Sequence, residues 1–68
     1  MKTIHEFLNE IEENKKIDLS LGKKSHYFMT VELVDSLNVV EFMIKKNYST
    51  ADIKRCARGF YDIIIYYS

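Results

Sequence analysis

The sequence predicts a mostly α-helical fold, a small domain of three helices, and three observations lead to this class. The chain has no proline and only two glycines among 68 residues, so few positions force the backbone out of a helix. The N-terminal and middle segments carry apolar residues at the i, i+3, i+4, i+7 spacing of one helix face. The last twenty residues carry a third stripe of this kind. At this length we expect a single domain, residues 1–68.

The first helix is predicted over residues 3–15. Thr3 can cap it, because Glu6 follows three places later at the spacing of a capping box. The apolar face consists of Ile4, Phe7, Leu8 and Ile11. Lys15 and Lys16 stand at the C-terminal end, where positive charge complements the helix dipole.

The next segment, residues 17–34, loses the helical period and favours a short β-hairpin. Apolar and polar residues alternate on both sides of a turn-like stretch at 22–25. The alternating apolar residues are Ile17, Leu19 and Leu21 before the turn, and Met29, Val31 and Leu33 after it.

A second helix is predicted from Thr30 or Asp35 to Lys46, so helix and hairpin compete for residues 30–34. The helix is favoured by apolar residues at a 4-3-4 spacing. These are Leu33, Leu37, Val40 and Ile44.

The third helix is predicted over residues 49–67, with Ser49 as its cap and Asp52 three places later. Its apolar stripe is Ile53, Cys56, Ala57, Phe60, Ile64 and Tyr67. Gly59 would weaken this helix by about 1 kcal/mol relative to alanine. The alternative is an α+β fold in which the helix stops near Gly59 and residues 60–67, rich in β-branched and aromatic side chains, form a strand.

The charge of the chain is balanced, with ten basic and ten acidic residues. Domains that bind nucleic acid usually have a pI above about 9, so this composition argues against nucleic acid as the main partner. The charged N-terminus lacks the apolar stretch of a signal peptide. The longest apolar run, IIIYY, is far shorter than the roughly 20 residues of a membrane span. We expect a soluble cytoplasmic protein.

No cofactor, metal or catalytic centre is expected. Cys56 is the single cysteine, which excludes a disulfide within the chain. Cys56, His5 and His26 are the candidate soft metal ligands, and none of them is paired at a ligand spacing. Cys56 is predicted to be buried and unreactive in the stripe of the third helix. A domain of this size also has little room for a substrate pocket, so we expect no enzymatic activity.

The junction between the second and third predicted helices, residues 45–58, is rich in basic residues. Asn47 tolerates the left-handed turn of a helix–turn–helix motif. However, Met43 is large for the close helix packing of that motif, and Asp52 would oppose phosphate binding. The residues that could contact nucleic acid or an acidic partner are Lys45, Lys46, Lys54, Arg55 and Arg58. A nucleic-acid-binding regulator is therefore the alternative function.

The C-terminal block FYDIIIYY, residues 60–67, carries apolar side chains on nearly every side, whether it forms a helix or a strand. Covering all of them requires more partners than so short a chain provides. We therefore predict a protein interface here, in the simplest case between two copies of the chain. Its residues are Tyr61, Ile63, Ile65, Tyr66 and Tyr67. The leading hypothesis is a small non-enzymatic regulatory or inhibitory protein that binds itself, as a homodimer, or a heterologous protein.

Overall fold

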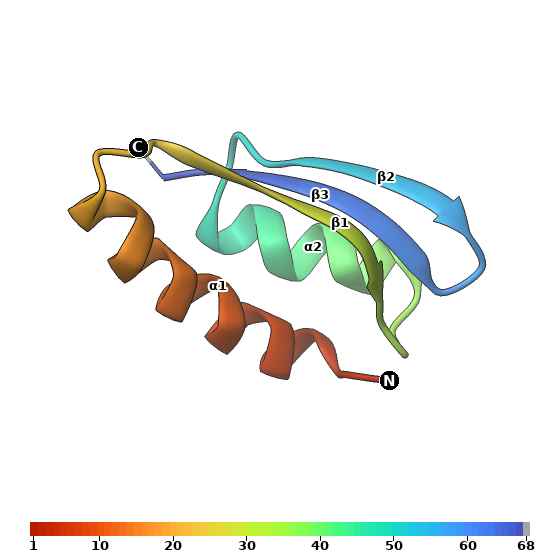
Figure 1. The fold of residues 1–68 in the computed structure, drawn as a ribbon. Helices are drawn as coiled ribbons and strands as arrows, with labels where there is room; N and C mark the ends of the chain where they lie inside the picture. The colour runs from red at the N-terminus through yellow and green to blue at the C-terminus, as the bar shows by residue number, and fades with distance from the viewer. Residues whose placement is uncertain (68) are drawn as a thin grey trace.

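The computed structural model describes residues 1–67, which form two helices and a three-stranded antiparallel sheet. The elements are α1 (Ile4–Ser20), β1 (Ser25–Glu32), α2 (Leu37–Asn47), β2 (Asp52–Ala57) and β3 (Phe60–Tyr66). The strand order is β1-β3-β2, so the last strand of the chain lies in the centre. Both helices lie on the same side of the sheet, and no element of residues 1–67 lies on its other side (Figure 1).

The prediction of a mostly α three-helix domain is wrong, because residues 49–67 form the hairpin β2–β3 instead of a third helix. Arg58 and Gly59 make the two-residue turn, and Gly59 has φ +81°. Short hairpin turns of this type need a positive φ that glycine adopts without strain. The strand of the alternative interpretation, residues 60–67, corresponds to β3 at Phe60–Tyr66.

α1 has the predicted start and a later end. Thr3 accepts a hydrogen bond from the Glu6 backbone N–H at 3.2 Å, and the Glu6 carboxylate accepts one from the Thr3 N–H at 3.1 Å. The helix then continues to Ser20. The hairpin predicted over residues 17–34 is therefore wrong, and its second half, β1, pairs with β3. The alternating pattern before the turn comes from Ile17, Leu19 and Leu21, which are exposed on the last turn of α1 and just beyond it.

α2 begins at Leu37, after the N-cap residue Ser36, and ends at Asn47. Its start therefore agrees with Asp35 and not with Thr30, which belongs to β1. Leu33 lies before the helix, where its backbone N–H donates to the Gly59 carbonyl at 2.9 Å. Neither helix in the described part of the chain combines the length and apolar character of a membrane crossing.

The core lies between the sheet and the two helices. Every second residue of β3 points into it, and each of these is almost fully buried. The core residues are Ile4, Phe7, Ile11, Phe28, Val31, Leu33, Val40, Ile44, Tyr48, Ala51, Tyr61, Ile63 and Ile65. Phe7 of α1 meets Phe28 of β1 edge to face, with ring centroids 5.1 Å apart. One side of the sheet is thus closed by the chain itself.

Both edge strands are irregular. The pairing of β1 with β3 shifts between Phe28 and Val31, and Thr30 there has φ +52°. The pairing of β2 with β3 shifts between Arg55 and Ala57. Bulges of this kind twist an edge strand away from straight pairing with another strand.

Candidate functional site

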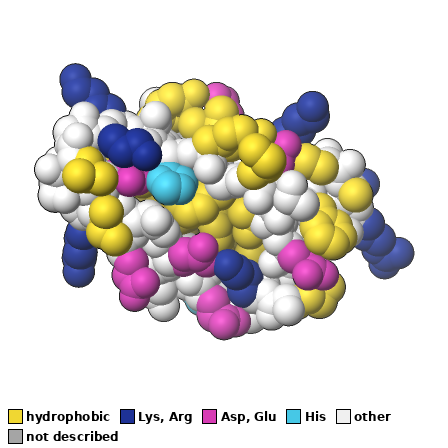
Figure 2. Space-filling view, viewed as in Figure 1, with side chains coloured by type: hydrophobic (Ala, Val, Ile, Leu, Met, Phe, Trp, Pro, Cys, Tyr) yellow, Lys and Arg dark blue, Asp and Glu magenta, His cyan; other side chains and the backbone are white. Residues whose placement is uncertain are grey.

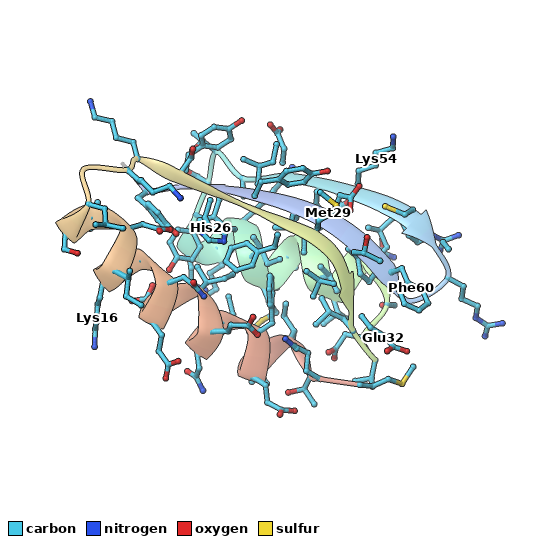
Figure 3. All side chains as sticks on the ribbon, viewed as in Figure 1. Lys16, His26, Met29, Glu32, Lys54 and Phe60 are labelled. Atoms are coloured by element: carbon cyan, nitrogen blue, oxygen red, sulfur yellow. The ribbon has the colours of Figure 1, made fainter. Side chains whose placement is uncertain are left out.

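The side of the sheet that the helices leave uncovered carries a group of exposed apolar side chains. We call this uncovered side of the sheet the open face and describe it by eight of its residues: Tyr27, Met29, Asp52, Lys54, Cys56, Asp62, Ile64 and Tyr66. Met29 and Lys54 point away from the helices, whereas His26 points towards them (Figure 3). Tyr27 is 52% exposed, Met29 69% and Tyr66 37%. Figure 2, which has the same orientation as Figure 1, shows apolar side chains gathered along the top of the molecule, where the sheet lies.

The register of the sheet arranges the open face in rows across the strands. One row contains Tyr27, Ile64 and Asp52, since Ile64 of β3 pairs with both neighbours. In the next row Asp62 pairs with Lys54 of β2. Apolar side chains therefore dominate the β1 half of the face, and both signs of charge occur on the β2 half.

Hydrogen bonds hold the two aspartates of this face. Asp62 accepts from the Thr30 backbone N–H at 2.9 Å, which is the main cause that lowers the pKa of the Asp62 carboxyl. The Tyr66 hydroxyl donates to Asp52 Oδ2 at 3.2 Å, and this contact raises the pKa of Tyr66. Within residues 1–67, Lys54 takes part in no ion pair, so its ammonium is available to another molecule.

Cys56 is exposed on the open face, and the prediction that it is buried is wrong. The prediction placed it in a helical stripe, but the residue lies in β2, an edge strand. A hydrogen bond to Asp62 is the first cause that raises the pKa of the thiol. His26 pairs with Ile65 and contacts Asp18 of α1 on the helix side of the sheet, whereas Cys56 contacts Asp62 on the open face, so Cys56 and His26 do not form a nucleophile–base pair.

The predicted interface residues separate into two groups. Tyr61, Ile63 and Ile65 face the helices and are 2%, 0% and 0% exposed, so they have no side-chain area for a partner. Tyr67 is half-buried against α1, and of the five only Tyr66 lies on the open face. The prediction assumed that both faces of a strand at 60–67 lacked cover, whereas α1 and α2 cover one of them.

The basic residues predicted as one surface lie in three places. Lys45 and Lys46 end α2, and Lys54 stands on the open face. Arg55 and Arg58 line a hollow of about 440 Å³ beside the start of α2, which also includes Leu33 and Asp35. The helix–turn–helix that would have brought them together is absent from residues 1–67, because a strand follows α2.

A second polar cluster lies on the helix side of the sheet, around Asp18. This carboxylate is 4% exposed and accepts from the Tyr67 hydroxyl at 2.6 Å. It also contacts His26 Nδ1 at 2.7 Å, and Lys23 lies at 3.9 Å. The Tyr67 hydrogen bond is the first cause that lowers the pKa of Asp18. The cluster ties the end of α1 to β1 and to the residue after β3, a structural role.

In the described range 1–67, no group of three His, Cys, Asp or Glu residues is arranged to hold a metal ion. Comparison of the chain with protein-family models, curated proteins and solved structures gives no match.

Tyr27 and Met29 are the residues of the open face that sequence reasoning missed as a binding surface. The alternation in residues 29–33 grouped Met29 with Val31 and Leu33, whereas the bulge between Phe28 and Val31 leaves Met29 exposed and Val31 buried. The alternation was assigned to a hairpin with residues 17–21, which left no reason to ask what its outward side chains contact.

Proposed function

We propose that the protein is a small non-enzymatic regulator that acts by binding another protein chain through the open face of its sheet. The observation that carries the proposal is the exposure of Tyr27, Met29 and Tyr66 on one uncovered face. Exposed apolar patches with a polar surround are typical of interaction sites. Tyrosine and methionine are both enriched at protein interfaces.

The charges of the open face favour a protein over a nucleic acid. Asp52 and Asp62 provide two carboxylates against the single ammonium of Lys54. Phosphate binding depends on an excess of positive charge, which this face lacks. The remaining basic residues lie elsewhere on the molecule, so the basic-surface alternative gains no support from the fold.

We also propose that the protein works in the cytoplasm. Cys56 is unpaired and exposed, and an exposed thiol persists in a reducing compartment, whereas oxidising compartments convert such thiols into disulfides.

Affinity capture with the tagged protein tests the binding function. The bait is offered both a cell lysate and an untagged copy of the same chain, so that self-association is detected as well. The double variant Tyr27→Ser with Met29→Ser should lose the captured chains. The matched control is Leu19→Ser with Leu21→Ser, which removes two apolar residues that are similarly exposed near the end of α1.

The comparison of the two variants decides the outcome. Chains that bind the native bait and the control, but not the open-face variant, support the proposal. A set of captured chains that is the same for all three baits would refute it, provided that circular dichroism shows all three baits to be folded.

A further inference from the structure

We infer that the occupant of the open face is a second copy of this chain, in a two-fold dimer whose sheets pack face to face. The inference rests on the proposed function, because it names the partner of the same face. It follows from three properties of the molecule: the edges of the sheet, the arrangement of charges on its face, and the size of that face.

The edges of the sheet are poorly suited to a partner. β1 is interrupted by the bulge at Thr30, and β2 by the bulge between Arg55 and Ala57. β2 also carries Lys54 and Arg55 in succession. Bulges and charged side chains are the features by which edge strands resist pairing with a further strand. Two copies therefore meet through the face and not by extending the sheet.

The charges on the β2 side of the face are complementary to those of a second copy. A two-fold axis that crosses the strands at the level of Ile63 places the row of Ile64 over the copy's row of Asp62. On the β2 side this brings Asp52 of each copy opposite Lys54 of the other. In the centre it brings Asp62 opposite Ile64, where Asp62 keeps its hydrogen bond from the Thr30 N–H. On the β1 side it brings Tyr27 opposite Met29, a contact between an aromatic ring and a thioether that is favourable.

The net charge agrees with a second copy as the partner. The chain has a formal net charge of zero, so two copies do not repel each other as a strongly charged pair would. Each dimer would form the Asp52–Lys54 contact twice, once for each copy, as an isologous interface requires.

The size of the face sets the expected strength. Three strands about 4.8 Å apart and roughly 20 Å long give a footprint of about 300 Å² before side-chain relief is counted. Stable interfaces bury about 800 Å² on each partner. The dimer is therefore weak and should dissociate on dilution.

Charge reversal at the two positions tests the arrangement. Lys54→Asp makes the facing pair acidic in both copies, and Asp52→Lys makes it basic, so each variant alone should be at least about 10-fold weaker in self-association. An equimolar mixture of the two variants restores both contacts and should associate as tightly as the native chain. Sedimentation velocity over a dilution series measures all four samples, including the native protein.

A control mixture separates this geometry from general attraction between opposite charges. Glu41→Lys and Lys45→Asp exchange charges one turn apart on α2, away from the open face. Each of these variants should dimerise as the native chain does, and mixing them should add nothing. Circular dichroism confirms that each variant is folded.

The outcomes distinguish the inference from the proposed function. A native chain that stays monomeric at millimolar concentration overturns the inference, and so does a native dimer that Lys54→Asp and Asp52→Lys leave intact. If a different polypeptide then depends on Tyr27 and Met29 for capture, the proposed function still holds. If no chain depends on them, both fail.

Discussion

Two neighbouring isoleucines of β3 provide a sharp test of the fold, because they differ only in the face that they occupy. Ile63 is fully buried in the core, and Ile64 is half-buried on the open face, outside the core cluster. We expect Ile63→Ala to destabilise the protein severely and Ile64→Ala to have a small effect.

The magnitudes follow from burial. Ile63→Ala removes three carbon atoms at about 0.8 kcal/mol each and leaves a cavity that the helices cannot fill, so the cost is about 3–4 kcal/mol. Ile64→Ala exposes no cavity, because solvent reaches the site, and it loses mainly the strand preference of a β-branched residue, about 1 kcal/mol. A single core of this size rarely supplies more than about 3–5 kcal/mol. The loss from Ile63→Ala is therefore most of the free energy of unfolding, and it should lower the Tm by about 15–25 °C.

Urea and thermal unfolding, followed by far-ultraviolet circular dichroism at high dilution, measure both free energies of unfolding without a contribution from self-association. Equal losses for the two variants would refute the strand assignment, because a strand places positions 63 and 64 on opposite faces and the helices cover only one of these faces. A larger loss for Ile64→Ala would mean that the opposite face of β3 is the buried one.

Three further predictions concern the polar contacts. The Tyr67 hydroxyl lowers the pKa of the Asp18 carboxyl, so the folded protein prefers the charged form of Asp18. The charged carboxylate should therefore stabilise the fold above about pH 4, and this stabilisation should be lost as the pH falls further. Asp18→Asn should remove that acid dependence of the Tm. Thr30→Gly should raise the free energy of unfolding in urea by up to about 1 kcal/mol, because threonine is strained at φ +52°. Cys56 should react with a thiol reagent in the native state, and Asp62→Asn should speed the reaction at neutral pH, because Asp62 raises the pKa of the thiol.

The N-terminal helix shows what local sequence determines. Its start depends on contacts between residues three places apart, such as Thr3 and Glu6, and those contacts are present in the fold. Its buried face, which includes Ile4, Phe7 and Ile11, also follows from the local spacing of apolar residues. Such signals are contained within a few turns of the chain, so they can be read without knowing what lies across the core.

The C-terminal half shows where local sequence is not sufficient. Residues such as Ile53, Phe60 and Ile64 satisfy a helical spacing, yet Ile53 and Ile64 lie on opposite faces of the sheet. The deciding contacts are between β1 and β3, whose nearest paired residues, Glu32 and Phe60, are 28 residues apart in the chain. The periodicity of 49–67 contains no information about this pairing, and Gly59 was the local sign of a turn that the helix interpretation treated only as a weakness.

The sequence predicted an uncovered apolar surface that involves the C-terminal block, but it did not predict which residues form that surface. The C-terminal block does contribute to an uncovered apolar face, through Ile64 and Tyr66. The rest of that face comes from Tyr27 and Met29, which only strand pairing brings beside β3. A prediction confined to one segment therefore selected Ile63 and Ile65, the residues that the helices bury.

The composition of the open face points to an association that is reversible. Permanent homodimers have interfaces more hydrophobic than this one and usually larger, whereas here Asp52, Lys54 and Asp62 are interspersed with the apolar side chains. These charged groups keep the free face compatible with water, so the monomer persists on dilution. In the proposed dimer, Asp52 and Lys54 would exchange contacts between the copies, and Asp62 would keep its hydrogen bond from the Thr30 N–H. We therefore expect both forms to be populated, with concentration deciding which surface the protein presents to other chains.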